Sequence, residues 1–306
     1  MRFRALDKSG QAVSGLTLGM DGDTPPAERQ SMLLAALEAG INCFDLAEAD
    51  LTLFDDLAPV LDQVERNLLF VSVRLGTGRD GSGAIVRDFS PDRLMGMVET
   101  ITARSGLGYL DLCLLDDPAG PELPLTSLNA LKAAREEQRI RRLGIAGAGD
   151  AMDAYITSSA FDVLVTPYSL ISGWQDRNRL KDAAKSDMAV IGYNYYPPEL
   201  QPQQPAGEAA VGGLFSRLMG KPAPVAAPPI VEPLRGYHFL ERTKNWTPED
   251  ICLAYAMTEP GLASVLIRPR STEHLASLAL VPDRELPSNL PAQIEMARFS
   301  SAGDAA

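Results

Sequence analysis

The chain is poor in the residues that build transition-metal centres. Its 306 residues include only two histidines, His238 and His274, and three cysteines, Cys43, Cys113 and Cys252. The cysteines lie inside apolar segments and lack the paired spacing of a metal site, so we interpret them as reduced core residues. We therefore predict no metal site.

The sequence also lacks a long apolar run and an excess of positive charge. No window approaches the ~20 apolar residues that a membrane-spanning helix needs, and the N-terminus shows no apolar segment of signal-peptide length. Lysine and arginine number 28 against 40 acidic residues, a formal net charge of -12. Such a chain repels phosphate backbones and anionic lipid. We expect a cytoplasmic protein that neither binds nucleic acid nor inserts into membranes.

Short apolar runs do occur, and they alternate with amphipathic segments in the pattern of repeated βα units. The predicted strands are 13–18, 42–45, 68–73, 110–115, 142–145, 163–165, 188–193 and 264–267. Prolines at helix starts predict helices such as 26–38 and 91–104. Eight units in roughly 250 residues are typical of a closed (β/α)8 TIM barrel, an α/β fold with its reactive residues at the C-terminal strand ends. A doubly wound open sheet is the alternative, which the absence of a Gly-rich dinucleotide fingerprint disfavours.

One region, 197–233, interrupts this pattern because it is rich in Pro, Gly, Ala and Gln. Within it, residues 208–219 could form a short helix with one apolar stripe. We interpret the segment as a lid over the barrel mouth, with a docking element for a partner as the alternative. The predicted organisation is a barrel over 1–283 that contains this insertion, followed by a C-terminal helix and flexible tail over 284–306.

The run Gly-Ile-Asn-Cys-Phe-Asp-Leu-Ala-Glu-Ala-Asp at 40–50 resembles the signature of the aldo-keto reductases. In that family the run closes on Ala-Tyr-Gly, and the tyrosine donates a proton to the substrate carbonyl. Here Asp50 stands at the tyrosine position. A carboxylate is ionised near neutral pH, so it cannot replace a phenol as proton donor unless its pKa is raised by several units.

The same resemblance extends over residues 3–280. It is carried by Phe-Val-Ser-Val-Arg-Leu-Gly at 70–76, Leu-Gly-Tyr-Leu-Asp-Leu-Cys-Leu-Leu-Asp-Asp-Pro at 107–118, Arg-Ile-Arg-Arg-Leu-Gly-Ile at 139–145 and Ile-Arg-Pro-Arg-Ser-Thr-Glu-His-Leu at 267–275. It implies a barrel that reduces carbonyls with a nicotinamide hydride, using an Asp, a Tyr, a Lys and a His at the strand ends.

Only the aspartate of that catalytic set is kept, as Asp45. Asp50, Arg74 and Asp116 stand where the resemblance implies the tyrosine, the lysine and the histidine. We expect a bidentate ion pair between Arg74 and Asp45, but a guanidinium has no proton to exchange. Losing a positioned general acid removes a factor of about 10²–10⁴, so conventional carbonyl reduction is not expected. Together with Asp117 these carboxylates could instead bind a hard cation, which the charge of Arg74 opposes.

Cofactor binding is a separate question. The resemblance implies that the nicotinamide carboxamide is held by side chains at positions that read Ala146, Gly147 and Val165 here, and those side chains offer no hydrogen bonds. The small-residue loop 146–150 opens a predicted helix and could approach a phosphate. The remaining candidates are Tyr193 for stacking on the nicotinamide, and Arg270, Ser271 and Glu273 for the adenosine phosphate and adenine. The expected cofactor is NAD(H), with NADP(H) as the alternative.

A barrel kept while its chemistry is removed indicates binding or regulation. Our hypothesis is a non-catalytic NAD(H)-binding regulator; the alternatives are an NAD(P)H-dependent reductase with an atypical active site, and an interaction protein that binds no nucleotide. Resemblance to degenerate family members implies the division protein FtsZ and a histidine-kinase pathway as partners. The tail ends in Ala305-Ala306, similar to C-termini that the ClpXP protease recognises, with an unpacked polar tail as the alternative.

Overall fold

The computed structural model describes residues 1–306 except 22–23, 48–50, 81, 202–235 and 304–306. Two compact units are formed, Met1–Tyr195 with Cys252–Leu286, and Tyr196–Ile251 with Pro287–Ala306. Three sequence predictions lie outside the described residues. They are the carboxylate at position 50, the apolar helix within 208–219 and the Ala-Ala end of the tail.

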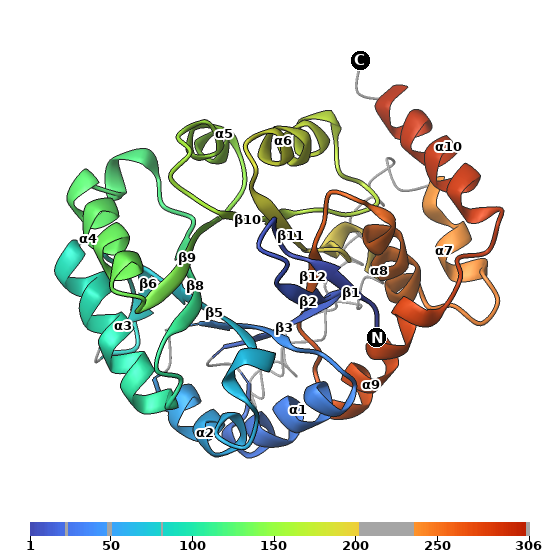
Figure 1. The fold of residues 1–306 in the computed structure, drawn as a ribbon. Coiled ribbons are helices and arrows are strands. Elements are labelled where there is room, and N and C mark those ends of the chain that lie inside the picture. Colours follow the sequence, from blue (N-terminus) through green and yellow to red (C-terminus); the bar gives the residue numbers. More distant parts are fainter. Residues whose placement is uncertain (22–23, 48–50, 81, 202–235, 304–306) are drawn as a thin grey trace, which may run out of the picture. The chain divides into compact units, whose positions relative to one another are not determined.

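The first unit is built around eight parallel strands that close into a barrel (Figure 1). Their bounds are β3 (Leu16–Met20), β4 (Cys43–Ala47), β5 (Phe70–Leu75), β8 (Leu110–Asp116), β9 (Ile140–Ala146), β10 (Val163–Pro167), β11 (Ala189–Tyr193) and β12 (Ser264–Ile267). β12 pairs with β3 through Val265 opposite Leu16, which completes the closure. The predicted TIM barrel is therefore confirmed, and an open doubly wound sheet is excluded.

Helices follow the strands and surround the barrel (Figure 1). They are α1 (Pro26–Glu38), α2 (Thr52–Leu61), α3 (Pro91–Ser105), α4 (Leu125–Glu136), α5 (Asp150–Thr157), α6 (Trp174–Lys185), α8 (Pro248–Thr258) and α9 (Thr272–Leu280), with short 3-10 turns η1 (Arg66–Leu68), η2 (Gly120–Glu122) and η5 (Val281–Asp283). The second unit contains η3 (Pro198–Leu200), α7 (Phe239–Arg242) and α10 (Leu290–Gly303). Prolines open α1 and α3 as predicted, because a proline costs no backbone donor at a helix start.

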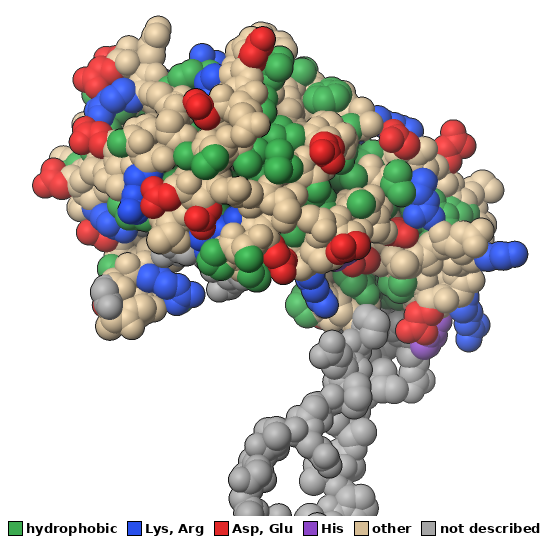
Figure 2. Space-filling view, turned by 90° about the horizontal axis from the view of Figure 1, so that it is seen from below, with side chains coloured by type: hydrophobic (Ala, Val, Ile, Leu, Met, Phe, Trp, Pro, Cys, Tyr) green, Lys and Arg blue, Asp and Glu red, His purple; other side chains and the backbone are tan. Residues whose placement is uncertain are grey.

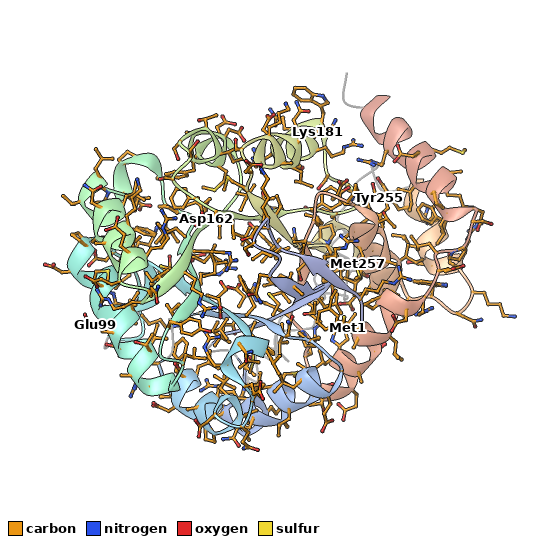
Figure 3. The ribbon with its side chains drawn as sticks, viewed as in Figure 1. Met1, Glu99, Asp162, Lys181, Tyr255 and Met257 are labelled. Atoms are coloured by element: carbon orange, nitrogen blue, oxygen red, sulfur yellow. The ribbon has the colours of Figure 1, made fainter. Side chains whose placement is uncertain are left out.

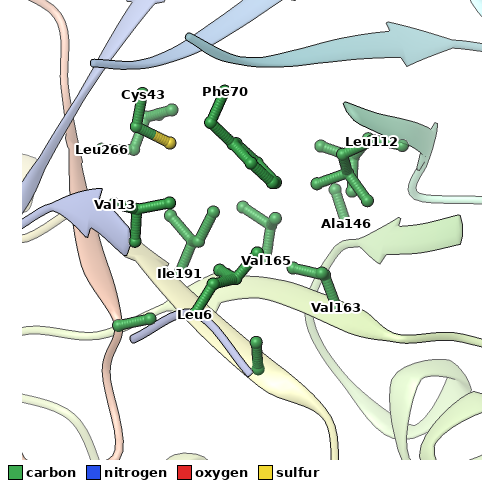
Figure 4. Close-up of a cluster of buried hydrophobic side chains, with 13 residues drawn as sticks. Leu6, Val13, Cys43, Phe70, Leu112, Ala146, Val163, Val165, Ile191 and Leu266 are labelled. Carbon is green, nitrogen blue, oxygen red and sulfur yellow. The ribbon is translucent and has the colours of Figure 1, made fainter. Parts of the chain in front are cut away.

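An N-terminal hairpin, β1 (Phe3–Ala5) and β2 (Ala12–Ser14), closes one end of the barrel. Its Leu6 and Val13 join the buried cluster inside the strands, seen with Phe70 and Ile191 in Figure 4. The predicted strand 13–18 was wrong in its extent: it merged the end of β2 with β3. The two strands separate at Gly15, whose N–H donates to the carbonyl of residue 2 instead of continuing a barrel strand.

Two arginine contacts tie this hairpin to distant segments. The guanidinium of Arg4 donates to the main-chain carbonyls of Met257, Glu259 and Leu262, in and just after α8; Met257 is labelled in Figure 3. Arg142 of β9 pairs with Asp7 at 2.6 Å. Burial raises the pKa of the Asp7 carboxyl, but hydrogen bonds from Arg142 and Ser9 outweigh burial and lower it. The carboxylate form of Asp7 is therefore stabilised in the fold.

A partly buried carboxylate makes a similar contact between elements. Asp162, labelled in Figure 3, accepts from the N–H of Leu143 at 2.9 Å and pairs with Arg135 at 3.2 Å, joining β10, β9 and α4. The three cysteines are buried and form no disulfide within the described part of the chain, as predicted. Among the described helices, none is long and apolar enough to cross a membrane.

A second hairpin, β6 (Thr77–Arg79) and β7 (Ile85–Arg87), follows β5 directly. Gly76, between β5 and β6, has a φ of 97°, and a Cβ at this position would lie 2.1 Å from the Phe89 ring. Only glycine fits both conditions. Arg87 then binds both carboxylate oxygens of Glu122, at 3.2 and 2.8 Å, and donates to the carbonyl of Asp117 at 2.7 Å. The hairpin thereby fixes the loop that follows β8.

Candidate active site at the barrel mouth

Three of the four positions that correspond to the catalytic set meet at the C-terminal ends of adjacent strands. Asp45 lies on β4, Arg74 on β5 and Asp116 at the end of β8, and strand register brings them together. Arg74 Nη2 lies 2.6 Å from Asp45 Oδ2, while Arg74 Nη1 lies 3.0 Å from Asp116 Oδ1. The expected bidentate pair with Asp45 was therefore wrong, because the guanidinium divides its donors between two carboxylates.

The bridge is largely shielded from water. Side-chain exposure is 4% for Asp45, 15% for Arg74 and 25% for Asp116. Burial alone would lower the pKa of Arg74, but the two carboxylates raise it above its ordinary value. Ser72 Oγ donates to Asp45 at 3.1 Å, so this carboxylate has a second partner. The guanidinium is consequently a fixed positive charge between the two carboxylates.

Tyr193, at the end of β11, is the phenol of this mouth. Its ring packs against the buried cluster. Burial raises the pKa of Tyr193; among nearby charges, Arg74 lowers it and Asp117 and Asp116 raise it, with a net upward shift. A phenol with a raised pKa is a weaker acid than free tyrosine.

The predicted carboxamide positions lie at the end of β9, in the loop that follows it and on β10. Ala146 is buried in the barrel cluster, as is Val165. Gly147 has a φ of 149°, and its N–H donates to the carbonyl of Val165 at 3.0 Å. A Cβ at position 147 would lie 2.2 Å from Asp117 Oδ1. The space beside this loop is thus filled by a carboxylate from the neighbouring strand end.

The predicted adenosine-binding residues gather at the start of α9. Ser271 is the N-cap, and its hydroxyl accepts the N–H of His274 at 3.2 Å. The main-chain N–H of Glu273 itself and the hydroxyls of Ser271 and Thr272 lower the pKa of the Glu273 carboxyl, so that carboxylate occupies the helix start. The exposed side chain of Arg270 forms no ion pair with any residue that the structure describes. At the start of α9, Arg270 is available to bind an anion, whereas the Glu273 carboxylate competes with an anion for the same place.

Two residues at the mouth were missed by sequence reasoning. Arg268, directly after β12, lies over Gly19, where a Cβ would be 3.2 Å from its Cγ, and its Nε is 3.9 Å from Asp21 Oδ2. Its place at a strand end was the available signal. Arg87 carried no signal, because its partner Glu122 lies 35 positions later in the chain.

The arrangement of metal-ligating residues and of surface charge bears on what the chain could bind. Within the described ranges, no group of three or more His, Cys, Asp or Glu residues is arranged to hold a metal ion. On the face shown in Figure 2, acidic and basic side chains are interspersed with apolar ones, and the described side chains form no broad basic area. That face offers no continuous cationic surface to a phosphate backbone.

Comparison with known proteins agrees with this architecture. Residues 14–297 match the Aldo/keto reductase family, so the chain belongs to that family of oxidoreductases. An aldo-keto reductase from Bacillus halodurans, in its holo form, superposes with a TM-score of 0.77 at 17% identity, covering 97% of this chain and 96% of that one. No curated protein sequence matches the chain.

Two structures of a putative aldo-keto reductase from Pseudomonas aeruginosa are also similar. Each has a TM-score of 0.64 and 19% identity; the shares covered are 91% of this chain and 93% of that chain in one case, and 92% and 95% in the other. At this level of identity the similarity shows the fold alone.

Proposed function

We propose that this chain binds NAD(H) at the mouth of its barrel without reducing carbonyls, and that it acts as a regulator of bacterial cell division and cell-cycle signalling. The observation that carries the proposal is the buried bridge in which Arg74 lies between Asp45 and Asp116. Carbonyl reduction needs a proton as well as a hydride. Around this bridge the guanidinium holds its protons and the nearby phenol is a weakened acid.

The described residues fit a dinucleotide in several respects. Tyr193 offers a half-buried ring at the mouth, the exposed residues 148–150 follow the buried Gly147, and Arg270 offers an unpaired cation at the start of a helix. A bound dinucleotide would supply a hydride-carrying nicotinamide ring. The fit is incomplete where Glu273 occupies the start of α9, because a phosphate bound there must displace that carboxylate.

The regulatory part of the proposal is supported by the loss of the acid in a retained barrel and by resemblance to KidO, a bacterial regulator that binds NAD(H). On this basis FtsZ and a histidine-kinase pathway are the proposed partners, and dinucleotide is the modulating ligand. Sedimentation of FtsZ polymers with and without the protein tests the first partner. If this protein sedimented with FtsZ polymers no more than an unrelated barrel protein does, the result would count against FtsZ as a partner.

The end of the chain supports a proposal about timing. A C-terminal Ala305-Ala306 suits recognition by ClpXP, which would limit the abundance of a regulator. Replacing both alanines by aspartate should lengthen the half-life of the protein in its host. An unchanged half-life would count against recognition by ClpXP.

Titration calorimetry with NADH, NADPH, NAD+ and NADP+, combined with a turnover assay over a broad aldehyde panel, tests the main proposal. Binding without turnover is the expected result, and the preferred cofactor would show whether Arg270 reads a 2′-phosphate. Turnover would favour an NAD(P)H-dependent reductase with an atypical active site. Absence of binding would favour an interaction protein that uses the barrel as a rigid support for its loops.

A further inference from the structure

Asp117 has a main-chain conformation that needs explanation. It directly follows β8 and has a φ of 50°, in the left-handed region that most side chains avoid. Two hydrogen bonds hold it there: its N–H donates to the Ala146 carbonyl at 2.8 Å, and its own carbonyl accepts from Arg87 at 2.7 Å. Strained conformations of this kind persist where surrounding structure enforces them, often at binding sites.

The consequence of this conformation is the placement of the Asp117 carboxylate. Oδ1 would lie 2.2 Å from a Cβ on Gly147, so it occupies the space where a side chain at position 147 would begin. Gly147 is itself fixed, with a φ of 149° and its N–H bound to Val165. Asp117 thus presents an acceptor at the end of β9, where residue 147 presents no side chain.

This acceptor is available to a ligand. The Asp117 side chain is exposed, and no hydrogen bond or ion pair to its carboxylate is found within the described part of the chain. Asp116, by contrast, has an oxygen bound to Arg74. Asp117 directly follows β8 and Tyr193 is the last residue of β11, so both lie at the C-terminal ends of the barrel strands.

The surroundings favour a neutral N–H donor over a cation. Arg74 and Arg87 already supply positive charge on either side of the loop after β8. A carboxamide NH2 can donate to a carboxylate without adding charge, whereas a carboxylate ligand would meet like-charge repulsion from it.

We propose that Asp117 recognises the carboxamide of the nicotinamide ring, accepting an N–H from it in place of a side chain at position 147. This inference rests on the proposed function, because it assumes that the mouth binds NAD(H). It makes Asp117 a specificity-determining residue: the amide of NAD+ is accepted, and the carboxylate of its deamidated analogue, nicotinic acid adenine dinucleotide, is rejected.

The experiment is calorimetric titration of the full chain with NAD+, the deamidated analogue and ADP-ribose, which lacks the ring. The wild type should bind NAD+ more tightly than the analogue by about tenfold to a hundredfold, the usual range for a hydrogen bond to a charged group. Asp117→Asn keeps the shape and tolerates the same φ, yet can donate to a carboxylate. It should reduce the NAD+ preference at least about tenfold and leave ADP-ribose affinity unchanged.

Asp92→Asn is the matched control, since it removes an equal charge from the exposed first turn of α3, outside the proposed binding residues. It should leave the preference intact. An equal fall in both variants would reduce the effect to long-range charge and overturn the inference. So would equal wild-type affinity for NAD+ and its analogue. Failure of the wild type to bind either NAD+ or ADP-ribose would overturn the proposed function itself.

Discussion

Arg74 reaches Asp45 through a single contact, Nη2 to Oδ2 at 2.6 Å, and its other terminal nitrogen is bound elsewhere. A lysine at this position would offer one ammonium group to both carboxylates, and it could exchange a proton. Arginine instead gives a rigid fork that joins β4 to β8 across β5. Arg74 therefore forms a structural connection between three neighbouring strands of the barrel.

Removing this cation should destabilise the fold strongly. Arg74→Met leaves two mostly buried carboxylates facing one another, and breaking such a pair typically costs about 3–5 kcal/mol. Urea unfolding measures the loss. Arg104→Met is the control, because its partner Asp55 and Arg104 itself are both well exposed, so it should cost at most about 1 kcal/mol. Equal costs for the two variants would contradict a buried bridge.

Restoring the tyrosine alone should not restore reduction. Asp50→Tyr returns a phenol to the acid position, but Arg74 cannot exchange a proton and Asp116 cannot donate to a carbonyl while ionised. We expect no turnover of aldehydes with NADH or NADPH from this single variant. The triple variant with Arg74→Lys and Asp116→His should gain measurable turnover. Activity in the single variant would show that the other two positions are not defects.

Gly76 should tolerate no side chain. Gly76→Ala adds a Cβ that collides with Phe89 and requires a φ of 97°, so we expect a loss of roughly 1–3 kcal/mol from overpacking alone. Gly106→Ala is the matched control: it has a φ of 69° but nothing within 4 Å of the added Cβ. It should cost only the backbone strain, on the order of 1 kcal/mol. Chemical denaturation of both variants separates the collision from the strain.

The Asp7 carboxylate should make stability depend on acid pH. Its pKa is lowered in the fold, chiefly by Arg142 and Ser9 acting against burial. A lowered carboxyl pKa stabilises the fold above the unfolded value of ~3.9, and this contribution is lost as pH falls through the folded value. Asp7→Asn should therefore lower the free energy of unfolding at pH 7 and have a smaller effect near pH 3. Arg142→Gln should reproduce this pattern, and a constant deficit at both pH values would contradict it.

The barrel could be predicted from the sequence because its strands are buried on both faces and read as apolar runs. The hairpin β6 and β7 could not, since both strands are three residues long and β7 is fully exposed, which leaves no periodic signal. Gly15 marks the boundary that the predicted strand 13–18 crossed, and an isolated glycine in a strand is a recognised sign of such a break.

The site was predictable by position but not by geometry. Asp45, Arg74 and Asp116 each fall at the end of a predicted strand, so their convergence followed from the fold. How Arg74 divides its donors depends on the register of three strands, which apolar periodicity does not specify. The left-handed Asp117 depends on Arg87, whose role is visible only when the hairpin is in place.

The hydrogen bond from the Arg4 guanidinium to the carbonyl of Leu262 joins residues that are 258 positions apart in the sequence. On a ribosome, Arg4 must therefore wait for 258 further residues before it finds this partner, and the strand at 16–20 must likewise wait for its neighbour at 264–267. At typical synthesis rates of about 5–20 residues per second, that delay is on the order of tens of seconds. During this delay the strand at 16–20 has an unpaired edge, which can associate with other chains unless a chaperone covers it.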